Sequence, residues 1–326
     1  MVPVASTPGT RTLVVRFSGD AKGLQRGVKE AESKLDKFQR KVDKAWQSMK
    51  PAAIAGGAVA GAALVDVIMA GMDIERAVDR VSAALGATPE QSARIGEVAG
   101  TLYADAWGES AGEVAAAVEA VMVSIDGMGQ ASAAELQGAT EHALAFAEAF
   151  QIDVQRAAQV AGEAVKYGLA ADATEAFDLL TAAAQKVPPT LREEVVDAVD
   201  EYGHFFQMLG LDGPQAFGLL AAGAAKGQYG IDKTGDAVKE FTIRATDMST
   251  ATREAYETLG MSTEEMTNKL LAGGDTANEA FNQILDGLLS IPDAGEQAEA
   301  ALALFGTPLE DLNVSEIPEF LQSLRD

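Results

Sequence analysis

Apolar side chains recur through residues 24–49 at steps that alternate between four and three residues. They are Leu24, Val28, Ala31, Leu35, Phe38, Val42, Ala45 and Met49. Such steps give the period of about 3.5 residues that marks a coiled-coil seam, whereas a helix that covers a globular core has a period of about 3.6. The pattern therefore predicts a long helix over residues 21–49 that packs along one stripe against another helix.

The segment that follows, Ala52–Met72, is built almost wholly of small and apolar residues and carries one charge, Asp66. Gly57 and Gly61 have the small-xxx-small spacing that lets two helices approach closely in a membrane. The longest uncharged run, Pro51–Val65, is however shorter than the roughly 20 apolar residues that span a bilayer. Asp66 in its continuation costs about 2.5–3.5 kcal/mol at a helix centre. The segment favours close helix packing in water, and membrane contact stays an open alternative.

Charge is divided unevenly along the 326 residues, whose formal net charge is −24. Residues 1–50 hold eleven Lys or Arg and five Asp or Glu, a net of +6, and the rest hold fourteen against forty-four, a net of −30. The sequence thus predicts a basic helix on an acidic body. An acidic surface repels phosphate, so we expect no stable nucleic-acid binding by the body.

The first 20 residues are expected to form an arm with one strand-like run, Thr12–Phe17. One strand cannot form a sheet alone, so it would pair with another copy of the chain, pair with a different chain, or stay extended. Pro3 and Pro8 interrupt the apolar positions, and no secretory signal is recognised. We therefore expect synthesis and retention in the cytoplasm of the producing cell. Without cysteine, the chain has no disulfide, thiolate metal site or cysteine nucleophile.

Beyond Met72 the sequence has the closely spaced helix start and stop signals of an all-α protein. Three corners place a glycine at the left-handed C′ position, then an N-cap residue, then a Gln or Glu that would complete a capping box. They are Gly86–Thr88–Gln91, Gly210–Asp212–Gln215 and Gly260–Ser262–Glu265. Further helix starts are expected at Ser110, Ser132, Thr190, Asp275 and Asp293. The predicted helices are 21–49, 52–84, 89–106, 111–125, 133–150, 154–168, 173–186, 191–208, 214–226, 233–246, 250–259, 263–272, 276–289, 294–304 and 317–325.

Five segments are expected, with the helices after the second segment arranged as an array of antiparallel hairpins. They are an arm with a short strand over 1–20, the coiled-coil and Gly/Ala-rich apolar helices over 21–84, an Ala-rich helical subdomain over 85–187, a second helical subdomain over 190–306, and a tail over 307–326 that continues into a longer chain. Pro188 and Pro189 mark the break between the two subdomains, because proline ends helices.

No constellation of catalytic residues is present. The two histidines, His142 and His204, stand in no recognised metal or catalytic motif, and we expect both to be structural. Glycine-rich phosphate loops and the G-x-S-x-G pattern are missing. We therefore expect a protein that is not an enzyme, with no catalytic, cofactor or metal site.

The order of these features resembles one family. The opening TLVVRFSGD, the heptad helix, the Gly/Ala-rich helix and the phrase LGATPEQ are similar to the N-terminal region of phage tail tape measure proteins. The stretch Ala300–Leu312 (AALALFGTPLEDL) is similar to the segment that often closes this region in actinobacterial phages and prophages. The resemblance covers about residues 10–315 and rests on structural and compositional motifs, with no catalytic position to carry over.

This resemblance implies a structural virion protein of a long-tailed phage, made in the bacterial host cytoplasm and located in the virion tail. Its helical chains would set the length of the tail tube during assembly and leave when DNA is ejected. The implied partners are further copies of the chain in a homo-oligomer, tail tube subunits, tail assembly chaperones and tail-tip proteins, with membrane contact during ejection as an open question. The chain is short for a tape, so we expect a fragment of a longer one or a compact state before extension.

The candidate self-association residues lie on the seam and beside it. They are Leu24, Val28, Leu35, Phe38, Val42, Met49, Gly57 and Gly61. Two other functions stay open on the sequence: a helical effector or pore-forming protein that inserts residues 52–72 into a membrane, and a general helical scaffold.

Overall fold

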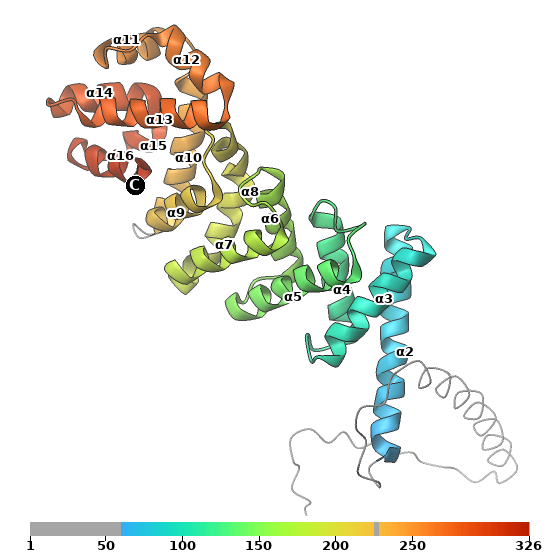
Figure 1. Cartoon of the computed structure of the whole chain (residues 1–326). Helices are drawn as coiled ribbons and strands as arrows, with labels where there is room; N and C mark the ends of the chain where they lie inside the picture. The colour runs from blue at the N-terminus through green and yellow to red at the C-terminus, as the bar shows by residue number, and fades with distance from the viewer. Residues whose placement is uncertain (1–59, 225–227, 326) are drawn as a thin grey trace, which may run out of the picture. The chain divides into compact units, whose positions relative to one another are not determined.

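The computed structural model describes residues 60–224 and 228–325, and these are almost entirely helical (Figure 1). The predicted all-α class is confirmed. The elements in chain order are α2 (Ala60–Leu85), α3 (Pro89–Ala104), α4 (Ala111–Ser124), α5 (Ala133–Phe150), α6 (Val154–Lys166), α7 (Ala173–Lys186), η1 (Pro189–Leu191), α8 (Arg192–Met208), α9 (Gly213–Ala224), α10 (Gln228–Arg244), α11 (Thr250–Thr258), α12 (Thr263–Ala272), α13 (Gly274–Leu289), α14 (Ala294–Phe305), α15 (Thr307–Glu310), η2 (Val314–Glu316) and α16 (Ile317–Arg325).

Two of the three predicted capping boxes form completely. The side chain of Thr88 accepts a hydrogen bond from the backbone N–H of Gln91, and the side chain of Gln91 accepts one from the backbone N–H of Thr88. Asp212 and Gln215 exchange the same two bonds, at 2.8 and 3.0 Å. The glycines at positions 86, 210 and 260 have φ of 59°, 64° and 66°, as the left-handed position requires. Each corner is therefore set by local sequence.

The third box is only half formed. Ser262 accepts from the N–H of Glu265 at 3.3 Å. The carboxylate of Glu265 instead pairs with Lys269 Nζ at 2.7 Å, one turn further along the helix. A lysine at this spacing competes with the N-cap N–H for the same carboxylate.

Several helix boundaries differ from the prediction. Thr190 is not an N-cap, because Pro189 begins the short helix η1 and α8 follows it without a side-chain cap. Asp275 lies inside the first turn of α13, which begins one residue earlier behind Gly273 at φ 70°. The helix predicted from 233 begins at Gln228. The short elements η1, α15 and η2 were not predicted, because they are too short to show a period.

From α3 to α10, each helix packs mainly against helices one or two places away in the chain (Figure 1). α4 contacts α3, α5 and α6, and α6 contacts α4, α5, α7 and α8. This is the contact pattern of a helical array, in which neighbouring hairpins stack and each one rests on the next.

The last helices fold back on earlier ones. α14 packs against α10 and α11, α15 against α10, and α16 against α13 and α9. The described helices from Leu64 onward belong to one compact unit. None of the helices within residues 60–224 and 228–325 has both the length and the apolar character that a bilayer crossing needs. The five predicted segments stay predictions, and the seam helix and the strand-like run lie outside the described residues.

Candidate functional site

The junction between α4 and α6 is made of small side chains. The buried residues are Ala111, Val114, Ala115, Ala117, Val118, Ala120 and Val121 on α4, and Ala157, Ala158, Val160, Ala161, Gly162 and Ala164 on α6. A Cβ at Gly162 would overlap the carbonyl oxygen of Ser124, so the two backbones touch. Such a junction buries little apolar area for each residue, and its stability depends on close fit.

A charged cluster joins α6 to α8. Arg156 on α6 bonds two carboxylates of α8, through Nη2 to Asp197 Oδ1 at 2.6 Å and through Nη1 to Asp200 Oδ2 at 2.5 Å. Glu163, two turns after Arg156, lies beside the carboxyl group of Asp200. Gln159 donates to Glu163 Oε1 at 3.3 Å, and the buried Oε2 has no donor within reach.

The two neighbouring carboxyl groups have opposite pKa shifts. Burial, and then the proximity of Asp200, raises the pKa of Glu163 to about 7 against the opposing effects of Gln159 and Arg156. Burial also disfavours the ionised form of Asp200. Hydrogen bonds from Glu163 and Arg156 outweigh it and lower the pKa of Asp200.

Tyr202 fixes α8 to α10. Its hydroxyl donates to Asp232 Oδ1 at 2.7 Å, and a Cβ at Gly235 would overlap its ring. Burial, and then the carboxylate of Asp232, raises the pKa of the Tyr202 phenol. The phenol therefore remains a hydrogen-bond donor throughout the physiological pH range.

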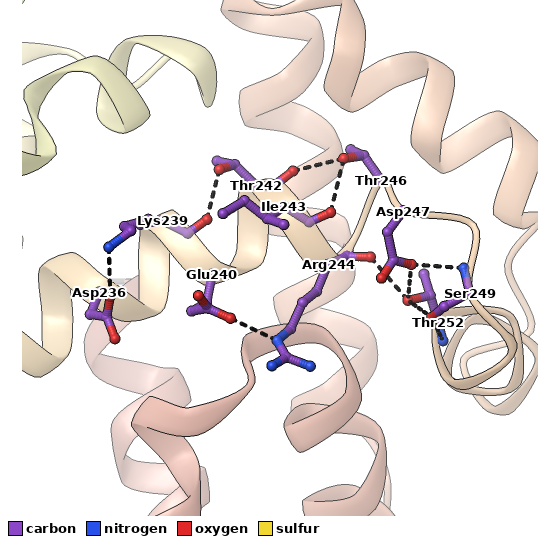
Figure 2. Close-up of polar contacts among 10 residues, drawn as sticks. All are labelled: Asp236, Lys239, Glu240, Thr242, Ile243, Arg244, Thr246, Asp247, Ser249 and Thr252. Carbon is purple, nitrogen blue, oxygen red and sulfur yellow. Dashed lines mark hydrogen bonds and ion pairs between the residues drawn. The ribbon is translucent and has the colours of Figure 1, made fainter.

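A polar network holds the corner between α10 and α11 (Figure 2). The buried hydroxyl of Thr252 lies 2.9 Å from the carbonyl oxygen of Arg244 and 2.8 Å from Asp247 Oδ1. Asp247 also accepts from the N–H of Ser249 at 2.7 Å. Just behind the corner, the Tyr256 hydroxyl donates to the carbonyl oxygen of Ala245 at 2.9 Å. The buried hydroxyl groups of Thr252 and Tyr256 in this corner therefore have hydrogen-bond partners.

Three phenylalanines form an aromatic cluster where α10, α13 and α14 meet. The ring centroid of Phe241 is 4.9 Å from that of Phe281 and 4.8 Å from that of Phe305. All three side chains are fully buried. Each aromatic ring buries far more apolar area than an alanine does, so this core is held more strongly than the α4–α6 junction.

Among the grooves on the described surface are two of similar volume. One, of about 460 Å³, lies between α9, α13 and α16 and is lined by residues that include Leu219, Phe281 and Leu324. The other, of about 490 Å³, lies beside Trp107 and has Glu109, Glu113, Glu148 and Asp153 on its walls. Glu113 accepts from the N–H of Glu109, and Asp153 caps α6, so these two acids have structural roles. In the part of the chain with described side chains, no group of three potential metal-ligating residues comes together.

Most of the predicted self-association residues lie outside the described residues: Leu24, Val28, Leu35, Phe38, Val42, Met49 and Gly57. Gly61 lies near the first described residue of α2. The histidines pack against aromatic rings, His142 with its centroid 6.4 Å from that of Phe177 and His204 5.5 Å from that of Phe205.

The α6–α8 cluster was not predicted from the sequence. A signal for it does exist, since Arg156 and Glu163 are seven residues apart and Asp197 and Asp200 are three apart. Each pair shares one helix face. Which faces meet is decided by tertiary packing.

Capped helices and small-residue junctions make the described part of the chain an all-helical array. Residues 103–306, from the end of α3 to the end of α14, match the family described as phage-related minor tail protein. The chain belongs to this family and is a structural component of the phage tail.

One relative extends this identification. The chain is 32% identical over 172 residues to the probable tape measure protein of Streptomyces phage phiC31. The match covers 53% of this chain and 24% of the relative, so the chain spans about a quarter of the relative's length. The resemblance to tape measure proteins drawn from the sequence is confirmed. No solved structure matches the chain.

Proposed function

We propose that this chain is the N-terminal region of a tail tape measure protein, whose helices set the length of the tail tube during assembly and leave the tube on DNA ejection. The similarity to the probable tape measure protein of phage phiC31 supports this function. Synthesis in the host cytoplasm and association with tail tube subunits, assembly chaperones, tail-tip proteins and further copies of the chain belong to the same proposal. The match to a tail protein family favours it over a membrane effector or a general scaffold.

The observation that carries the proposal is the local packing from α3 to α10. Each helix in this part rests mainly on helices one or two places away in the chain. A chain with such contacts can extend by opening one junction after another, without passing one segment through another. The array therefore serves as a stored form of a much longer helical chain.

The small-residue junctions keep the free-energy cost of this extension low. The buried residues of α4 and α6 are all Ala, Val or Gly. Each such side chain contributes less apolar burial than a leucine or phenylalanine would. Binding to other tail components can then offset the free energy that opening requires.

Tail length in engineered phage tests the proposal. An extended helix rises about 1.5 Å per residue, so in-frame deletion of residues 111–186, which contain α4 to α7, should shorten the tail by roughly 110 Å. Duplication of the same residues should lengthen it by a similar amount. Electron microscopy of negatively stained particles measures both changes. Unchanged tail length in viable phage with the duplication would refute the templating role of this region.

A further inference from the structure

The α6–α8 cluster has more acceptors than donors. Arg156 uses its two terminal nitrogens on Asp197 and Asp200. The Oε2 atom of Glu163 is buried, has no donor within reach, and belongs to a carboxyl group that lies beside the carboxyl group of Asp200. An unpaired buried oxygen is costly, and two adjacent carboxylates repel each other.

A single proton removes both penalties. If Glu163 carries it, its O–H can donate to Asp200, which stays ionised against Arg156. The buried Oε2 atom of Glu163 then takes part in a hydrogen bond, and the two carboxyl groups together hold one negative charge instead of two. Carboxyl pairs that share a proton in this way titrate as a unit.

We propose that Glu163 and Asp200 share one proton in the folded chain, and that loss of this proton as pH rises loosens the α6–α8 junction. The junction lies in the part of the array where each helix rests mainly on its sequence neighbours, so its strength affects the opening of that part. The stability of the contact between α6 and α8 would therefore depend on the protonation of this pair. The inference stands independently of the proposed function.

Other charged groups lie on the helices packed against α6. Besides α8, these are α4, α5 and α7. Their charged or titratable groups are Glu113 and Glu119 on α4, Glu135, Glu141, His142 and Glu148 on α5, and Glu175, Asp178 and Lys186 on α7. The helix α8 itself carries Arg192, Glu193, Glu194, Asp197, Asp200, Glu201, Tyr202 and His204. Asp200 is the charged group of these packed helices that shifts the pKa of Glu163, through a hydrogen bond and through its charge. Arg156 is the cation of α6 that acts on the pair.

The direction of the pH dependence follows from the two states of Glu163. Its pKa rises from an ordinary 4.5 to about 7 in the folded chain. Below the ordinary value both folded and unfolded chains hold the proton. Between the two values only the folded chain holds it, so stability falls as pH rises through this window and levels off above it.

The most direct test is a carboxyl carbon NMR titration of Glu163 in the full chain. We expect a midpoint near pH 7. In Asp200→Asn the midpoint should move down, because the neighbouring charge is gone. A wild-type midpoint near 4.5, or a midpoint unchanged by Asp200→Asn, would overturn the shared proton.

Urea unfolding at several pH values tests the linkage to stability. The ratio of the unfolding constants of wild type and Glu163→Gln should rise by up to about tenfold for each pH unit between roughly 5 and 7, because the amide cannot lose a proton. The matched control is Glu119→Gln, at a half-buried glutamate of the neighbouring helix α4, which should keep the wild-type pH dependence. If Glu163→Gln also keeps it, the junction is not proton-linked.

Discussion

Gly162 on α6 lies against the carbonyl oxygen of Ser124 at the end of α4, so closely that a Cβ on the glycine would overlap that oxygen. We therefore expect Gly162→Ala to lower the free energy of unfolding. Overpacking costs about 1–3 kcal/mol, and the higher helix propensity of alanine offsets at most about 1 kcal/mol. Urea unfolding followed by circular dichroism measures the difference.

Gly138 on α5 is the matched control, because nothing lies within 4 Å of a Cβ at that position. Gly138→Ala should raise the free energy of unfolding by about 0.5–1 kcal/mol through helix propensity alone. The two substitutions are predicted to have opposite signs. Two stabilising substitutions would contradict backbone contact between α4 and α6.

The corner in Figure 2 predicts a cost for losing one buried hydroxyl. Thr252 is fully buried, and its hydroxyl contacts Asp247 and the carbonyl oxygen of Arg244. Thr252→Val keeps the shape but leaves these acceptors with fewer donors, so we expect a loss of about 1–3 kcal/mol in thermal or urea unfolding.

Thr246, in the same corner, provides the comparison. Its hydroxyl bonds to the carbonyl oxygen of Thr242, one turn earlier in α10. Thr246→Val should change the free energy of unfolding by less than about 0.5 kcal/mol, because the Thr246 side chain is only half-buried and water can replace its hydroxyl. Equal losses for the two valine variants would mean that the Thr252 network adds no specific stability.

Hydrogen exchange should be uneven along the chain. Amides of α4 and α6, which meet through Ala, Val and Gly, are expected to exchange faster than amides of α10, α13 and α14 around Phe241, Phe281 and Phe305. Larger buried area gives a higher free energy of local opening. Exchange followed by mass spectrometry resolves these peptides. Equal protection across the chain would show that the small-residue junctions are not the weaker part.

The seam makes a prediction from sequence alone. Leu35→Asp together with Phe38→Asp places two charges in the heptad stripe and should abolish oligomers of the full chain. Multi-angle light scattering gives the mass. A mass equal to that of the wild-type chain would refute self-association through residues 24–49.

Local sequence was sufficient to predict most helices and their caps. Asp293 caps α14 as predicted, and Ser132 with Glu135 forms a full capping box. Local reasoning failed at Glu265, where two partners within one turn compete for a single carboxylate.

The charged cluster illustrates a different limit. Arg156 meets Asp197 and Asp200 across 41 and 44 residues of sequence. The sequence shows which residues share a face of α6 or of α8. It does not show that the two faces meet, because that depends on how the neighbouring hairpins stack.

The most direct measurement of the central claim is a distance between α4 and α6 in free protein and in assembled tails. The chain has no cysteine, so Val123→Cys and Gln159→Cys give a unique pair of spin-label sites, both on exposed side chains. Dilution of labelled chains with unlabelled ones isolates the distance within one chain.

In the free protein the two labels should be close, because packed helix axes lie about 8–10 Å apart. In purified tails an extended helix would place the two labelled residues about 54 Å apart. Broadening of the continuous-wave electron paramagnetic resonance spectrum reports a short distance, and the pulsed experiment reports a long one. A short distance in the free protein and a long one in tails would support a stored helical array that extends in the tail, and the same short distance in both would contradict it.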